Sequence, residues 1–192
     1  MTHPYHPQCG CATRRHMLGW AALASIGAIT GLTGLTGCSQ ADNSSVQSLK
    51  PVEIDGATSC ELDGMLLADY PGPKAQVRFA GQDKPSFFCD TVELFATLLA
   101  GEQVRAAQTV YVQDMGKADW EHPEGHWIDA KTAVYVVGSK RHGSMGTTIA
   151  SFAQRADAEK FAGEYGGTVY PYDGIKLDMV DLTGGALHDT RM

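Results

Sequence analysis

The chain has 192 residues, of which 43% are hydrophobic, and this suffices for one ordinary domain or two very small ones. Its formal charge is −7, from 22 acidic and 15 basic residues. This acidic balance argues against nucleic acid as a partner, because phosphate binding requires clustered cations.

The N-terminal segment has the pattern of an export signal. It contains no acidic residue before Cys38, its start carries the paired Arg14 and Arg15, and an apolar, small-residue stretch covers 17–32. It ends in Leu-Thr-Gly-Cys, the pattern of a bacterial lipobox. We therefore predict a cleaved lipoprotein signal peptide at 1–37 and lipidation of Cys38, whose acyl chains would hold the protein at a membrane. The Sec route fits best, the twin-arginine route is the second candidate, and a retained transmembrane helix is the alternative interpretation.

The next elements predict one small unit. Residues 38–50 are rich in Ser, Gln and Asn and are expected to form a flexible tether. The first folded unit, at 51–115, is predicted to contain two strands, a helix and a strand, at Met65–Ala68, Ala75–Phe79, Asp90–Ala100 and Thr109–Tyr111. Pro and Gly between the first two strands suit a hairpin turn. The helix begins with a capping-box pattern, because a Glu follows its first Asp by three residues.

The remaining elements repeat this order. The second unit, at 116–182, is predicted to contain strands, a helix and a strand at Ala133–Val137, Thr147–Phe152, Ala156–Tyr165 and Thr168–Tyr170, and residues 183–192 form a loose tail. Both predicted helices carry Glu-x-Phe in the same register. The sequence therefore predicts an α+β fold of two small similar ββαβ units packed together. The alternative is a single α+β domain whose two helices match by chance.

The first pattern that indicates chemistry contains two sulfur side chains. Cys60 and Met65 lie five residues apart around an Asp-Gly turn, which allows both sulfur atoms to face one point. Soft thiolate and thioether ligands select Cu(I) over harder ions. The alternative is a buried small cysteine beside a core methionine.

A second sulfur lies in the segment that joins two predicted strands. Met145 stands between small residues in the loop 138–146, whereas a core methionine normally lies in a periodic element. His142, three residues earlier, offers a nitrogen ligand. The alternative is an ordinary hairpin loop.

Several short motifs follow one another in a specific order. They are Cys60 with Gly64-Met65, Asp-Tyr-Pro-Gly-Pro-Lys-Ala-Gln from Asp69, Trp-Ile-Asp-Ala from Trp127, and the two ends of the loop that carries Met145. This ordered set, covering roughly Cys60 to Asp173, resembles the NosL family of outer-membrane copper-binding lipoproteins encoded with nitrous oxide reductase.

The resemblance implies a function and a place in the cell. It implies a periplasmic Cu(I) metallochaperone, lipid-anchored at the outer membrane, that delivers copper for assembly of the nitrous oxide reductase copper centres. The partners would be the reductase or its ABC-type maturation complex. The family's ligands fall on Cys60, Met65 and Met145, with His142 as a further candidate. The sequence departs from the family at Asp63, where many members have a second Cys, and at Ser144, where the loop often has Pro.

One alternative removes the metal role. Cys60 and Cys89 are the thiols that remain after cleavage and lipidation, and a disulfide between them would make a structural or thiol-redox lipoprotein. Otherwise Cys89 is expected to be a buried thiol. His122 and His126 have zinc-like spacing, but Pro and Gly between them argue for a solvated loop instead of a helical site. The chain shows no catalytic triad, phosphate loop or nucleotide fingerprint, so no enzyme activity is predicted.

Overall fold

The computed structural model describes residues 49–101, 104–144, 146–180 and 182. The predicted signal peptide 1–37, the lipidation site Cys38, the ligand candidate Met145 and the tail 183–192 lie outside these residues. Within the described ranges, no helix has both the length and the apolar character that crossing a membrane requires.

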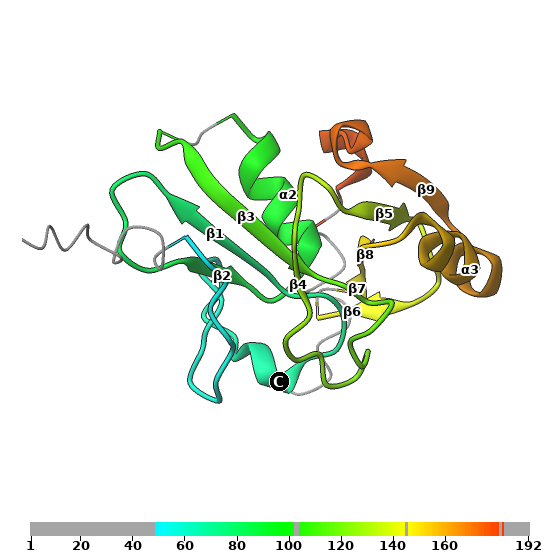
Figure 1. The fold of residues 1–192 in the computed structure, drawn as a ribbon, viewed down its shortest axis with the longest axis horizontal. Coiled ribbons are helices and arrows are strands. Elements are labelled where there is room, and N and C mark those ends of the chain that lie inside the picture. The colour runs from blue at the N-terminus through cyan, green and yellow to red at the C-terminus, as the bar shows by residue number, and fades with distance from the viewer. Residues whose placement is uncertain (1–48, 102–103, 145, 181, 183–192) are drawn as a thin grey trace, which may run out of the picture. The chain divides into compact units, whose positions relative to one another are not determined.

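The first half builds a four-stranded antiparallel sheet with strand order β2–β1–β3–β4 (Figure 1). Its central pair is β1 and β3, in which Ala75 faces Val112 and Val77 faces Val110. The helix α2 stands between β2 and β3 in the chain and contacts β1 and β2. The bounds are β1 (Ala75–Phe79), β2 (Ser86–Phe88), α2 (Thr91–Leu99), β3 (Ala107–Gln113) and β4 (Trp127–Asp129).

The second half repeats this topology with a three-stranded antiparallel sheet of order β8–β5–β9. The helix α3 contacts all three strands, and Figure 1 shows it beside this sheet, apart from α2. A short hairpin, β6 with β7, interrupts the connection between β5 and β8. The bounds are β5 (Val134–Val137), β6 (His142–Gly143), β7 (Gly146–Thr147), β8 (Ala150–Phe152), α3 (Arg155–Tyr165) and β9 (Thr168–Pro171), with single 3₁₀ turns η1 (Leu67–Asp69), η2 (Tyr172–Gly174) and η3 (Leu177–Met179).

In both sheets the first strand is central, and the second and third strands flank it. The predicted α+β class is confirmed, and each half has the order strand, strand, helix, strand. The described residues all belong to one compact unit. The boundary between the two ββαβ units at 115/116 therefore stays a prediction.

Both predicted helices form where local signals placed them. Asp90 is the N-cap of α2, and the reciprocal capping box with Glu93 is present. The first five residues of α2 are all buried, whereas Leu99, the last residue of the helix, is 37% exposed. The helix therefore enters the protein with its first turn, and its last turn lies at the surface. The second helix, α3, ends at Gly166, which has a φ of +79°.

The predicted strand Met65–Ala68 is wrong. Leu66 makes a single bridge to Ser59, and the chain then turns into η1. Apart from β3, the strand that pairs with β1 is β2, which the periodicity of the sequence did not indicate. The prolines on both sides of Gly72 explain the difference, because proline cannot donate to a strand ladder. Gly72 has the predicted turn conformation, with a φ of +81°, and the turn leads from η1 into β1.

The predicted strand Thr147–Phe152 is divided in two. The side chain of Thr148 donates to the carboxylate of Asp90 at 2.6 Å, and the carbonyl of Ile149 accepts from the hydroxyl of Thr91. These two residues bond to the start of α2 and separate β7 from β8 in the chain. The first turn of α2 thus joins the two halves of the protein.

The core consists of three clusters of buried side chains. The largest lies between the first sheet and α2 and also receives Tyr135 and Ile149 from the second half. Another covers α3 and the second sheet around Phe161. The third is small and contains Cys60, Leu67 and Cys89, with Met65 packed against it. This third cluster gathers sulfur side chains from distant parts of the chain.

Candidate metal centre

A tight loop brings Cys60 and Met65 together. The amide of Cys60 donates to the carbonyl of Met65 at 2.8 Å, and the amide of Gly64 donates to the carbonyl of Cys60 at 3.0 Å. The carboxylate of Asp63 accepts from the amide of Met65. Cys60 is buried and Met65 is half-buried against the same cluster. The Asp-Gly turn therefore directs a thiol and a thioether into one site.

A single carboxylate oxygen connects this loop to the start of α2. Oε2 of Glu93 accepts from the thiol of Cys60 at 3.2 Å and from the thiol of Cys89 at 3.1 Å. The same oxygen accepts from the amides of Cys89 and Asp90, the second of which is the capping-box bond. A helix cap thus also holds two thiols, and both cysteines are free.

The surroundings favour a protonated Cys89 thiol in the metal-free protein. The hydrogen bond with Cys60, burial and the negative charge of Glu93 together raise the pKa of the Cys89 thiol far above its ordinary value. Burial also raises the pKa of Glu93, against the thiol hydrogen bonds, which lower it. The site therefore disfavours additional negative charge unless a cation accompanies it.

One buried cation lies beside the cluster. The side chain of Lys74 is fully buried and donates to the carbonyls of Pro71 and Cys89, at 2.9 and 3.0 Å. Burial lowers the pKa of Lys74 to about 8, although the charges of Asp90, Cys89 and Glu93 oppose this shift. Lys74 is therefore a positive group placed behind the thiol pair.

Four side chains meet the geometric requirement for a metal centre. A ligand atom from each of Cys60, Asp63, Cys89 and Glu93 lies within 4.8 Å of the other three. Asp63 is exposed, whereas the other three are buried. The two sulfur atoms therefore lie less than 5 Å from a group that contacts solvent.

The loop 138–146 is tied to the same cluster. The hydroxyl of Ser144 donates to the carbonyl of Cys89 at 2.8 Å and to its Sγ at 3.2 Å. The position of Met145 is not described, but its immediate neighbour touches one of the two sulfur atoms. Two segments that sequence reasoning selected separately, the Cys60–Met65 loop and this loop, thus approach each other through Cys89.

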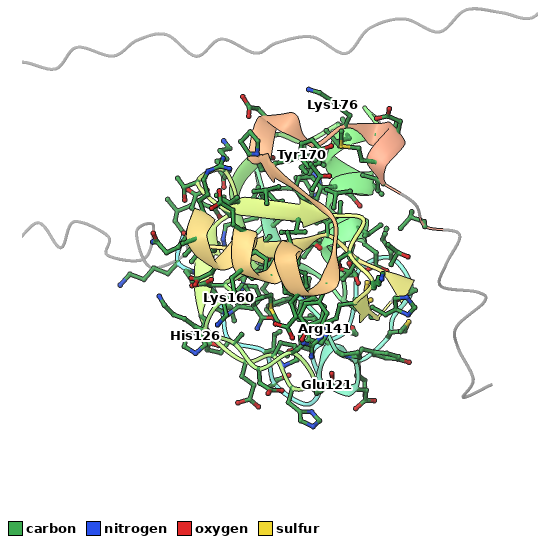
Figure 2. All side chains as sticks on the ribbon, turned by 90° about the vertical axis from the view of Figure 1, so that its right-hand side faces the viewer. Glu121, His126, Arg141, Lys160, Tyr170 and Lys176 are labelled. Carbon is green, nitrogen blue, oxygen red and sulfur yellow. The ribbon has the colours of Figure 1, made fainter. Side chains whose placement is uncertain are left out.

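Arg141 holds the same loop against the rings of two aromatic residues. Its guanidinium lies over the rings of Trp120 and Tyr165, 4.6 and 5.1 Å from their centroids, and pairs with Glu121 at 3.2 Å. Figure 2 shows Arg141 and Glu121 near each other. The indole of Trp120 also donates to the carbonyl of His142. The loop is therefore held by specific contacts at Arg141, His142 and Ser144.

The structure describes some of the site residues that were selected from the sequence and not others. Cys60 and Met65 share one cluster. His142 begins the β6–β7 hairpin with an exposed side chain, two residues before Ser144. Met145 and Cys38 lie outside the described residues.

Sequence reasoning missed Cys89, Asp63 and Glu93 as members of the cluster. The capping box gave a partial signal, because it predicts that the Glu93 carboxylate turns back to the backbone amide of Asp90. Asp90 is the neighbour of Cys89 in the chain. No local pattern indicated that Cys60 would approach the same carboxylate, since 33 residues separate them.

The fold and the cluster together define a small α+β protein, with the order strand, strand, helix, strand in each half and a candidate metal centre that carries thiols and a thioether. Comparisons with known proteins agree, since the NosL family model matches residues 51–180. The chain belongs to the NosL family, which confirms the resemblance of its motifs.

Individual relatives extend this result. The chain is 40% identical over 149 residues to the copper-binding lipoprotein NosL of Stutzerimonas stutzeri. The matched region covers 74% of this chain and 77% of the relative. The chain is 39% identical over 141 residues to the protein of the same name from Achromobacter cycloclastes, covering 71% and 69%. The crystal structure of the copper chaperone NosL from Shewanella denitrificans superposes with a TM-score of 0.66 at 40% identity, over 68% of this chain and 98% of the other.

Proposed function

We propose that this protein binds one Cu(I) ion through thiol and thioether ligands and passes it to a protein partner, for assembly of the copper centres of nitrous oxide reductase. The observation that carries the proposal is the convergence of Cys60, Met65 and the neighbour of Met145 on one small cluster. The names of the relatives, copper-binding lipoproteins and a copper chaperone, support it and describe binding proteins instead of enzymes.

The proposed ligands are Cys60, Met65 and Met145, with His142 as a nitrogen ligand. Sulfur ligands of this kind select Cu(I), because soft donors prefer soft cations. Cys60 approaches the ion from one loop, and Met145 and His142 belong to the other. A site built from two loops can open when one loop moves, which is how a carrier would release its ion.

The position of the site suits transfer to another protein. Asp63, on the rim, is exposed and lies within 4.8 Å of the sulfur atoms, so a partner could reach them after a small displacement. The formal charge of −7 would favour encounter with a basic docking surface. The partner would be the reductase or its ABC-type maturation complex.

The location follows from the N-terminal pattern. We propose export and lipidation at Cys38, which would anchor the domain to the periplasmic face of the outer membrane. Labelling with a fatty-acid analogue tests this step, and a Cys38→Ser variant that still carries the label would contradict it.

The copper site is tested by competition with a Cu(I) chelator under anaerobic conditions. The full chain is used with Cys9, Cys11 and Cys38 replaced by Ser, so that Cys60 and Cys89 are its remaining cysteines. Cys60→Ser and Met65→Leu should each weaken binding. Met115→Leu is the matched control, because Met115 packs against the cluster around Phe161. Parent affinity retained in both site variants would refute the ligand assignment.

Delivery is tested separately in cells that respire nitrous oxide. Deleting the gene should lower the copper content of the purified reductase, and the Cys60→Ser variant should not restore it. Full copper loading without this protein would contradict the delivery role.

A further inference from the structure

The two buried thiols have the separation that one shared ion requires. Their Sγ atoms lie within 4.8 Å of each other, and both donate to the same oxygen of Glu93. Two thiolates that each contact one ion at about 2.3 Å, the distance known for zinc, are at most about 4.6 Å apart. The upper limit of 4.8 Å on the distance between the two sulfur atoms is therefore compatible with one ion that contacts both Cys60 and Cys89.

We propose that Cys89 is a second thiolate ligand, so that Cu(I) is held between the sulfur atoms of Cys60 and Cys89. The inference rests on the proposed copper function and specifies its ligand set. It assigns a metal-binding role to a residue that the family resemblance does not mark and that sequence reasoning treated as a buried thiol.

The chemistry of the surroundings supports this pair over the other donors in the cluster. Cu(I) prefers sulfur, whereas the carboxylates of Asp63 and Glu93 are hard ligands suited to other ions. The Glu93 oxygen already accepts two backbone amides. In this arrangement Glu93 orients the thiols, and the copper takes the sulfur atoms.

The charge of the product is also accommodated. Binding replaces the protons of two thiols, which leave to solvent, by one Cu⁺, so the occupied pair carries one negative charge. The buried amine of Lys74 donates to the carbonyl of Cys89 and lies behind the pair. It supplies a nearby positive charge that an apolar wall would not.

Ser144 gives Cys89 a connection to the second loop. Its hydroxyl lies 3.2 Å from the Cys89 sulfur. A partner that displaces the loop would therefore disturb this ligand directly. Met65, packed against the same cluster, is placed to complete the coordination as a thioether.

The experiment compares variants in the full-length background that retains Cys60 and Cys89. Each variant is loaded anaerobically with Cu(I), and three quantities are measured: the affinity against a chelator, the number of sulfur neighbours from X-ray absorption, and the ultraviolet thiolate-to-copper charge-transfer absorption. Thioethers contribute little to the last quantity, so it counts thiolates.

The site variant is Cys89→Ser, and Cys89→Ala is made in parallel because a buried free cysteine packs as a small apolar side chain. Circular dichroism verifies the fold of each. Ser144→Ala is the matched control, since it removes a hydrogen bond to the Cys89 sulfur and leaves both thiols. Asp63→Asn tests whether the carboxylate binds the ion.

Removing the Cys89 thiol should halve the charge-transfer absorption, lower the sulfur count by one and weaken affinity by about 100-fold or more, the upper end of the effect of an outer-sphere partner. Ser144→Ala and Asp63→Asn should keep the full absorption. A folded Cys89 variant with unchanged absorption, sulfur count and affinity would overturn this inference alone. A parent protein that does not bind Cu(I) would overturn the inference and the proposed function together.

Discussion

Replacing Glu93 by Ala tests whether this carboxylate organises the site, and the expected loss of stability can be worked from its contacts. The substitution leaves the buried amides of Cys89 and Asp90 without their acceptor. An unsatisfied buried donor costs about 1–3 kcal/mol. The bond to Asp90 is long, at 3.3 Å, and removal of a buried charge offsets part of the loss. The expected decrease in the free energy of unfolding is therefore about 3 kcal/mol, a large part of the stability of a small domain.

The matched variant is Glu93→Gln, which keeps an acceptor for both amides. Since burial raises the pKa of Glu93, its charged form is destabilised in the folded protein. The Gln variant should therefore be at least as stable as the metal-free parent at pH 7. As pH falls through the raised pKa, the parent should gain stability relative to this variant.

Urea denaturation, followed by tryptophan fluorescence, measures the free energy of unfolding of the metal-free parent, Glu93→Ala and Glu93→Gln. An ordinary surface substitution changes the free energy of unfolding by about 0.5 kcal/mol or less. If the free energies of unfolding of Glu93→Ala and the parent differ by no more than this, the carboxylate is not the organising group inferred from its four contacts.

Other predictions follow from Lys74 and Gly72. Burial lowers the pKa of Lys74 to about 8 from an ordinary 10.5, because it disfavours the charged amine. The stability that the neutral form of Lys74 contributes to the folded protein is therefore fully present above pH 10.5. This stability is lost as pH falls through 8. This shift corresponds to about 3 kcal/mol. The free energy of unfolding of the parent relative to Lys74→Met should thus rise between pH 8 and 10.5, and a constant difference would contradict the shift. Gly72→Ala should cost more than Gly138→Ala by at least about 1 kcal/mol, the scale of strain from a forced core contact, in the same urea assay. Both glycines have a positive φ, but a Cβ on Gly72 would lie 2.8 Å from the Cα of Gly143, whereas a Cβ on Gly138 meets nothing within 4 Å. Equal losses would show that the close approach is unimportant.

The helices were predictable because their signals are local. A capping box begins α2 and a glycine ends α3, and each signal lies within a few residues of the boundary that it determines. The two central strands, β1 and β5, were predicted at Ala75–Phe79 and Ala133–Val137, close to the bounds that the structure has. The repeat became visible because these local signals occur in the same order twice.

The strands that sequence reasoning missed or misplaced depend on contacts that no local pattern encodes. The segment Met65–Ala68 has strand-like composition, but the prolines after it prevent a hairpin with β1. Thr148 and Ile149 lie in the predicted strand Thr147–Phe152, yet they pair with neither neighbouring strand because the start of α2 offers their polar groups partners. These hydrogen bonds join the two halves of the protein, so a short segment of sequence does not reveal their effect on the strands.

The candidate site divides in the same way. The proximity of Cys60 and Met65 follows from a five-residue turn, which sequence reasoning can evaluate. The approach of Cys89 depends on the packing of that turn against α2, and the approach of Ser144 depends on the anchored hairpin. Sequence reasoning therefore recovered Cys60 and Met65, and it treated Cys89 as a buried thiol without a metal role.

The central claim is that copper binds at the sulfur cluster beneath the Asp63 loop. A crystal structure of the Cu(I)-loaded protein, with anomalous scattering collected at the copper edge, tests it most directly. The account predicts one strong peak within bonding distance of the Cys60 sulfur. A peak at the loop of His122 and His126, with the cluster empty, would contradict it.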